Sequence, residues 1–282
     1  MTIALVTDST CNIPADLARE CHIHVTPLYV IWGDTSLKDG VDILEPEFYA
    51  RLASSNEIPK TSQASPQDFV ILFEKARKAE NADEVICPVV SSDLSGTYAS
   101  AMQAKAMVDF PVHVIDTRQV SWGLGHVLLA AAEARDGGAS AAEIVQTVTE
   151  TATRQMLLFT IESLDFLRRG GRIGNAKRLM GTMLRMQPVL EIREGIVHPV
   201  DTVRTRKRAL EQLLKVADVR GNVRHVNRLS VIHAEAKHDA KMLLDEAIEK
   251  LVPLETHFTY ATTVIGVHTG PGAVGLICEW GS

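Results

Sequence analysis

The sequence predicts an α/β protein of two domains, an α/β/α parallel-sheet domain followed by an α+β domain. Strand and helix patterns alternate through the first half of the chain, which is typical of βαβ units. The first run, "IALVTD", is rich in β-formers and has the character of a strand buried on both faces. After about residue 156 the pattern changes to hairpins mixed with helices.

The first half is expected to form a doubly covered parallel sheet. A serine cap, an N1 proline and a capping acid, which are Ser65, Pro66 and Asp68, mark one helix start clearly. Two further helical stretches share residues 120–153 and break at "DGG". The expected strands are 3–8, 24–32, 84–92 and 112–117, and the other expected helices are 14–23, 45–54 and 96–108.

The second half predicts a hairpin turning at Glu194-Gly195 within 188–205. No low-complexity linker separates the halves, so we place the domains at 1–155 and 156–282, with parts of the first segment packing against the second domain. We expect helices at 175–186 (rich in Met), 205–217 and 237–251, and strands at 229–235, 258–269 and 275–280.

Composition indicates a soluble cytoplasmic protein. Hydrophobic residues make up 46% of the chain, and the net charge of −6 argues against a nucleic-acid partner. The four cysteines are scattered without a C-x-x-C pair, which is typical of a reduced compartment. No stretch is apolar enough for a membrane span, which leaves at most transient membrane contact. The basic runs 167–178 and 204–208 are solvated faces or docking surfaces for an acidic partner or ligand.

Polar turns mark the candidate binding site. In "SSDLSGTY", Ser95 stands at the expected cap of a helix and Gly96 lets backbone approach a ligand. "PKTSQASP" places Thr61, Ser62 and Gln63 before the next capped helix. If both helices follow strands of one sheet, these hydroxyls and the turn "TDST" (7–10) meet at its carboxyl edge, where α/β folds bind ligands. Each of these residues could equally be an ordinary cap or turn residue.

Two glycine-rich turns add one histidine and one arginine. "HTGPGAVG" brings His268 and Thr269 to a tight turn after a strand, and no helix follows it to make a dinucleotide site. In "RRGGRIG", Arg172 is the arginine expected to point inward, where a guanidinium suits a carboxylate or phosphate. His22 and His24 lack a third ligand of suitable spacing, so we predict no metal.

Ser95 does not match the pattern of a hydrolase nucleophile, because Asp93 and Thr97 occupy the glycine positions of the nucleophile elbow. The turns supply donors but little acid–base machinery. The residues therefore favour capture of a small anion over chemistry performed on it, with no catalytic residue and no cofactor.

The motifs "VTDSTCNIP", "PKTSQASPQDF", "VVSSDLSGTYASA", "SLDFLRRGGRIG" and "HTGPGAVG", taken in order, closely resemble the DegV family from about residue 3 to 279. The resemblance implies a long-chain fatty acid buried in a tunnel between the two domains. It also implies a carrier role, in which a partner fatty acid kinase subunit phosphorylates the ligand's carboxylate to an acyl phosphate for phospholipid synthesis.

The resemblance places the carboxylate contacts on Thr61, Ser95, His268 and Arg172, with Ser62, Gly96 and Thr269 as secondary contacts. Asp93 beside the site is expected to face solvent, because an inward carboxylate would repel the ligand. Two alternatives stay open: a lipid storage, transport or sensing protein without a kinase, and a serine acyl hydrolase acting through Ser95.

Overall fold

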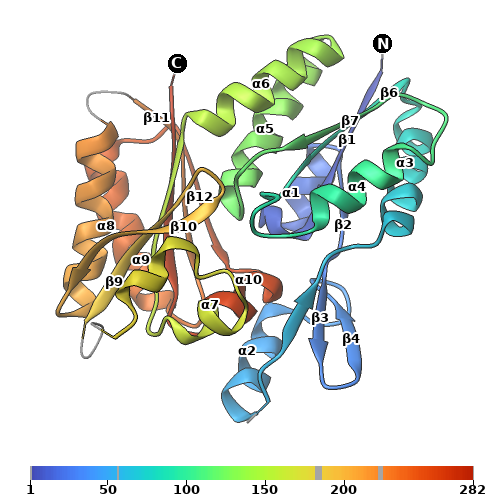
Figure 1. Ribbon diagram of the computed structural model, residues 1–282. Helices are drawn as coiled ribbons and strands as arrows, with labels where there is room; N and C mark the ends of the chain where they lie inside the picture. The colour runs from blue at the N-terminus through green and yellow to red at the C-terminus, as the bar shows by residue number, and fades with distance from the viewer. Residues whose placement is uncertain (1, 56, 182–185, 222–224, 282) are drawn as a thin grey trace.

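Two β-sheets of different type hold most of the strands in the computed structural model, which describes residues 2–55, 57–181, 186–221 and 225–281. The first is parallel, with strand order β2-β1-β6-β7. Helices α1 and α5 cover one of its faces and α3 and α4 the other (Figure 1). These strands and helices are β1 (Ile3–Asp8), β2 (Ile23–Thr26), β6 (Glu84–Val89), β7 (Val112–Asp116), α1 (Ala15–Glu20), α3 (Pro66–Glu80), α4 (Thr97–Lys105) and α5 (Trp122–Asp136).

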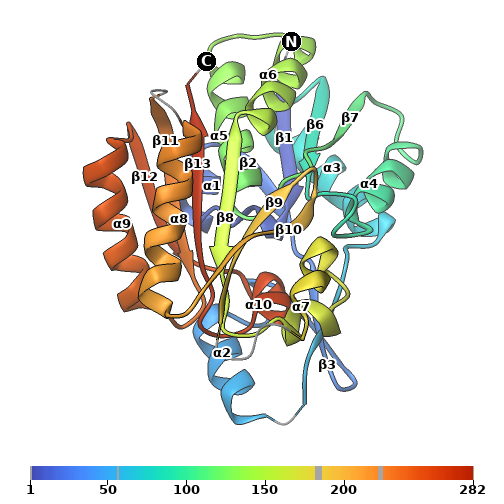
Figure 2. The same cartoon turned by 60° about the vertical axis from the view of Figure 1, so that its left-hand side comes forward.

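The second sheet is mixed, with strand order β10-β9-β8-β13-β11-β12, and only its β11–β12 pair is parallel. Helices α8 and α9 lie side by side against its outer face (Figure 2). The elements are β8 (Gln155–Thr160), β9 (Gln187–Arg193), β10 (Ile196–Val203), β11 (Val226–His233), β12 (Glu255–Tyr260), β13 (Val274–Trp280), α8 (Arg206–Gly221) and α9 (Lys237–Leu251).

Helix α5 lies between the two sheets and contacts strands of both, β1 and β6 on one side and β8 and β13 on the other. Every residue from Trp122 to Ala132 is buried, as expected of a helix that is apolar all round. Glycine allows the closest approach, because a Cβ on Gly125 would lie 2.8 Å from the carbonyl oxygen of Cys11. Helix α6 (Ala141–Thr153) follows after the predicted break and pairs with α5.

A small antiparallel sheet of order β4-β3-β5 packs, together with α2, against a short helix near the end of the chain. In that helix, Gly266 lets the backbone meet the side chains of Phe48 and Tyr49. A Cβ at Gly266 would lie 2.7 Å from the Phe48 ring and 2.6 Å from the Tyr49 hydroxyl oxygen. The Tyr49 hydroxyl also donates to the carbonyl of Ala261 at 3.1 Å. The elements are β3 (Tyr29–Trp32), β4 (Thr35–Lys38), β5 (Lys60–Ser62), α2 (Glu45–Ser54) and α10 (Thr263–Thr269).

Several local predictions are confirmed. Ser65 and Asp68 form a reciprocal capping box at α3. Helix α5 ends at Asp136 and α6 begins at Ala141, so the "DGG" break is real. Glu194 and Gly195 turn the β9–β10 hairpin with φ of 53° and 80°. The α/β fold class is confirmed as well, whereas the domain boundary at residue 155 stays a prediction.

Three elements differ from expectation. Residues 24–32 are not one strand, because the chain leaves β2 at Pro27 and Leu28 and enters β3 of another sheet. Residues 258–269 form the end of β12 and then helix α10. The Met-rich helix expected at 175–186 is a 3₁₀ helix, η2 (Gly174–Leu179), after the short α7 (Asp165–Arg169), and residues 182–185 of that expectation lie outside the described residues.

No helix in the described ranges is long and apolar enough to cross a membrane.

Asp39 fixes the start of α10. This residue is 3% exposed. Its carboxylate accepts from the Ser9 hydroxyl at 2.6 Å and from the Thr263 amide and hydroxyl at 3.1 and 2.7 Å. Ser9 belongs to the turn η1 (Ser9–Cys11) after β1, so one side chain ties α10 to the edge of the parallel sheet.

Asp39→Ala is expected to lower the free energy of unfolding by about 2–4 kcal/mol, because it leaves the two buried donors of Thr263 and the half-buried Ser9 hydroxyl without an acceptor. Denaturant titration measures this loss. Asp34→Ala, in an exposed turn nearby, is the matched control and should change stability by less than about 0.5 kcal/mol. Equal effects of the two substitutions would contradict the role given to Asp39.

Candidate functional site

A pocket lies between the two larger sheets, and its lining is mostly apolar. It takes side chains from β8, β9, β10, β11 and β13 on one side and from the loops after β1 and β6 on the other. No aspartate or glutamate lines it among the described residues. The apolar lining residues are Leu28, Val90, Leu94, Val120, Leu157, Phe159, Leu167, Ile192, Val197, Ile232, Ala261, Val264, Ile265, Ala273 and Val274.

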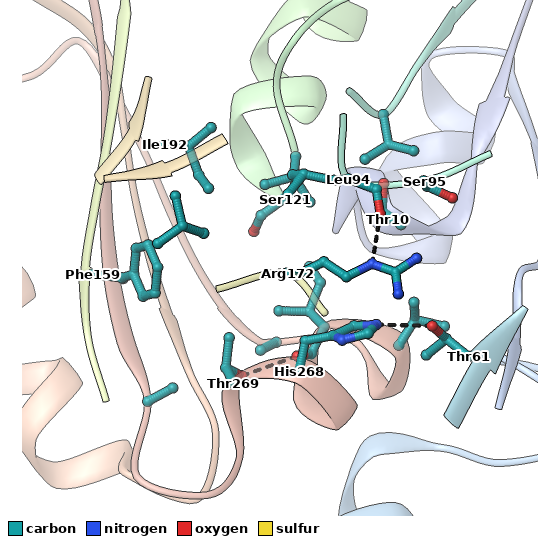
Figure 3. A pocket seen from close by; sticks show the side chains of 18 of the residues that line it. Thr10, Thr61, Leu94, Ser95, Ser121, Phe159, Arg172, Ile192, His268 and Thr269 are labelled. Atoms are coloured by element: carbon teal, nitrogen blue, oxygen red, sulfur yellow. Dashed lines mark hydrogen bonds between the residues drawn. The ribbon is translucent and has the colours of Figure 1, made fainter. Parts of the chain in front are cut away.

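Polar side chains gather at one part of this pocket (Figure 3). Arg172 extends between Ser95 and the pair formed by His268 and Thr61 in this view. They come from four separate segments, which are β5, the loop before α4, the turn after α7, and α10. The pocket therefore has an apolar body and a cluster of hydrogen-bond donors.

His268 on α10 and Thr61 on β5 form the central contact, with 2.8 Å between imidazole Nε2 and hydroxyl Oγ1. Burial, followed by the positive charge of Arg172, lowers the pKa of His268 to about 4, so the ring is neutral at pH 7. When Nε2 carries the proton, it donates to Thr61, and the Thr61 hydroxyl proton is free to donate into the pocket.

The other ring nitrogen of His268, Nδ1, is buried and has no hydrogen-bond partner within the described part of the chain. Gly170 makes this packing feasible, because a Cβ at Gly170 would lie 2.1 Å from Nδ1. The backbone after α7 thus passes directly over the imidazole, and a larger residue would displace the ring.

Arg172 is held by main-chain oxygens on the same turn and across the pocket. Its Nε donates to the carbonyl of Leu94 at 2.8 Å, and its Nη1 donates to the carbonyl of Gly170 at 2.5 Å. Its Nη2 makes no hydrogen bond to any described residue. The guanidinium is therefore fixed in place with one amino group left to meet an anion.

Ser95 lies just before α4, and Gly96, not Ser95, takes the cap position, so that expectation was wrong by one residue. The Ser95 hydroxyl lies 2.8 Å from the Thr97 hydroxyl and accepts from the Thr97 amide at 3.3 Å. No described imidazole is hydrogen-bonded to it, so the nucleophile–base pair of a serine hydrolase is not formed among the described residues.

The structure brings together nearly all of the predicted site residues. Gly96 is the exception, because it does not line the pocket. It packs against the side-chain amide of Gln63, and a Cβ at Gly96 would lie 3.0 Å from Nε2. Asp93 is exposed and pairs with Arg118, as expected of an acid beside this site. The predicted residues that line the pocket are Thr61, Ser62, Ser95, Arg172, His268 and Thr269, together with Gln63 and Thr10 of the turn "TDST".

Two placements were wrong in detail. Thr61 does not follow a strand of the parallel sheet but lies within β5 of the small antiparallel sheet. His268 does not follow a strand but lies in the last turn of α10. Ser121 was missed: it lines the pocket just before α5 with φ 56°, an uncommon value for serine. The short "QVSWG" stretch gives no signal for it.

His22 and His24 both contact Glu80, at 3.2 and 2.8 Å. Within the described residues, no group of three or more His, Cys, Asp or Glu side chains is arranged to hold a metal ion.

The family model described as "Uncharacterised protein, DegV family" matches residues 2–279. The chain belongs to the DegV family. Protein DegV of Bacillus subtilis is 33% identical over 278 residues, covering 98% of each chain. A DegV family protein from Thermus thermophilus, described by its fatty acid binding, is 32% identical with a TM-score of 0.93 and covers 99% of this chain and 100% of that one. A stearic acid-binding protein from Eubacterium ventriosum is 25% identical, with a TM-score of 0.90 and 98% of each chain covered.

The low pKa of His268 makes a prediction about the ligand-free protein. Because the folded-state pKa of about 4 lies below the reference value of 6.5, the neutral ring stabilises the fold fully above pH 6.5. This stability, about 3 kcal/mol, is lost as the pH falls from 6.5 through the folded-state pKa of about 4. His268→Asn should flatten the dependence of unfolding free energy on pH across this window. An unchanged slope, or a His268 ring that titrates near 6.5 by NMR, would contradict the assignment.

Proposed function

We propose that this protein binds a long-chain fatty acid in a tunnel between its two domains, with the acyl chain along the apolar lining and the carboxylate at the donor cluster. The observation that carries the proposal is a pocket lined by apolar side chains and closed at one part by two hydroxyls, an imidazole and a guanidinium, with no acid among the described lining residues. The relatives described as binding fatty acid or stearic acid support it.

The two parts of such a ligand need different surroundings. Each methylene moved from water to the apolar lining contributes roughly 0.8 kcal/mol before the cost of ordering the chain. A carboxylate buried without donors would cost several kcal/mol, so its oxygens must be met by hydrogen bonds or a cation. The cluster provides both, since Arg172 supplies a charge and the hydroxyls supply donors.

Each residue takes a defined part in this arrangement. The hydroxyls of Thr61 and Ser95 donate to the carboxylate oxygens, and Nη2 of Arg172 faces the charge. His268 orients Thr61 through the bond at 2.8 Å and closes the pocket beside it. The residues that make secondary contacts are Ser62, Gly96 and Thr269, and Gly96 acts through the side chain of Gln63. The arrangement requires no cofactor.

We further propose that the protein is a cytoplasmic carrier that presents this carboxylate to a partner fatty acid kinase, which forms the acyl phosphate. The ordered DegV motifs support a carrier role, and the four free cysteines suit a reducing compartment. The carrier itself needs no catalytic residue. A storage, transport or sensing protein would bind the same ligand but would not support phosphoryl transfer in a reconstituted assay.

Ser95→Ala should weaken fatty acid binding by about tenfold without unfolding the protein, because one hydrogen bond to a buried charge is lost. Isothermal titration with oleate measures the effect. Ser92→Ala is the control, since the exposed Ser92 hydroxyl bonds to Asp116 instead and should leave the affinity unchanged. Equal affinities for the wild type and Ser95→Ala would remove Ser95 from the site.

We propose the basic runs 167–178 and 204–208 as the docking surface for the kinase, and the following test concerns 204–208. Arg206 is unsuitable as a probe, because it pairs with Asp239 at 2.9 Å and with Glu162 at 3.4 Å inside the fold. Arg204 is exposed, so Arg204→Glu should raise the apparent KM for the loaded carrier severalfold in the reconstituted reaction. Lys75→Glu, on the exposed side of α3, is the charge-matched control. A KM raised equally by both variants would contradict this docking surface.

A further inference from the structure

A second cleft shares Thr61, Arg172 and His268 with the fatty acid pocket. Its other lining residues come from β5 and the segment before it, from α7 and Gly170 after it, and from Val267 of α10, against which α7 packs (Figures 1 and 2). The shared residues therefore form a wall between the two spaces. One side of this wall faces the apolar pocket, and the other faces a cleft of different character.

The charged side chains of this cleft are all cationic, and they lie beside apolar residues such as Phe166 and Val267. Lys60, Arg169 and Arg172 line it, and no aspartate or glutamate among the described residues does. Lys60 and Arg169 form no ion pair with any described residue, so their charges are not neutralised within the fold. The acid on α7, Asp165, is instead held by the neighbouring Arg168 at 3.2 Å, and neither of these lines the cleft.

This charge exceeds what a fatty acid needs. A single carboxylate carries one negative charge, which Arg172 and the hydroxyls already meet from the pocket side. Two more cations within the same cleft suit an anion of higher charge with several oxygens, and phosphate is the common one. Arginine in particular offers the forked donor geometry that matches phosphate oxygens.

We propose that the cleft lined by Lys60, Arg169 and Arg172 is a phosphate-binding subsite, which holds the phosphoryl group of an acyl phosphate whose chain lies in the apolar pocket. The acyl phosphate identity rests on the proposed function, whereas phosphate binding by the cleft does not. Arg172 takes part in both spaces, so it faces the carbonyl end and the phosphoryl end of one ligand. Lys60 and Arg169 contact only the phosphoryl end.

The test uses the full-length protein stripped of lipid and titrated with inorganic phosphate at constant ionic strength, followed by calorimetry and ³¹P NMR. Lys60→Gln and Arg169→Gln should each weaken phosphate binding by about tenfold, since each removes a charge-assisted hydrogen bond. Arg168→Gln is the control, one residue away on the same helix, and should change the affinity by less than about twofold. No saturable phosphate binding, or an equal loss in all three variants, would overturn the subsite.

A second set of titrations tests whether the phosphate site serves an acyl phosphate, and whether the two proposals stand or fall separately. Oleate loaded beforehand should weaken phosphate binding, because both ligands bring negative charge to Arg172, and independent binding would overturn the acyl phosphate assignment. Lys60→Gln and Arg169→Gln should retain oleate with wild-type affinity, and loss of oleate binding in both would contradict the division between pocket and cleft. A wild-type protein that binds phosphate in the expected pattern but no fatty acid would sink the proposed function and leave the phosphate subsite standing.

Discussion

The hydrogen bond between Thr61 and His268 joins residues 207 positions apart, and the site exists only where these two segments meet. Thr61 is on the small antiparallel sheet, which the first part of the chain builds, and His268 is on α10 near the end. Asp39, just after β4, accepts from Thr263 at the start of α10, and Tyr49 of α2 donates to the carbonyl of Ala261 just before it. Gly170 and Gly266 remove the side chains that would otherwise hold these elements apart.

The neutrality of His268 is as important as its position. A protonated imidazole would add a second cation beside the half-buried Arg172, and burial and the charge of Arg172 together lower the pKa of His268 to about 4. The cluster therefore offers one permanent positive charge and several neutral donors, which balances one carboxylate without excess buried charge. Asp93, the acid of the "SSDLS" motif, is exposed to solvent and paired with Arg118, so it does not compete with a ligand for Arg172.

The parts of this structure that depend on short stretches could be predicted from the sequence. The capping box at Ser65, the break at "DGG" and the turn at Glu194-Gly195 are each specified by residues within a few positions of one another. The four main contact residues could be named because the DegV motifs include them, although their roles in binding remain predictions. Thr61, Ser95 and Arg172 also stand in polar or glycine-rich turns with a visible chemical signal.

The failures concern elements that tertiary contacts decide. The β-branched stretch that ends in "TVIGVHT" favours a strand by propensity, but capping by Asp39 and packing of Gly266 against Phe48 make it helical. Residues 24–32 have strand character on both sides of Pro27, and no local pattern shows that the two parts belong to different sheets. Lys60 and Arg169 belong to ordinary basic surroundings in the sequence, and only the fold shows that they share a cleft.

The most direct measurement is mass spectrometry of the purified protein, first under native conditions and then after solvent extraction. We expect an additional mass that matches one long-chain fatty acid per chain, released only when the protein is denatured. A mass equal to that of the bare chain, unchanged after incubation with mixed long-chain fatty acids, would contradict the claim that the pocket between the two sheets is a fatty acid site.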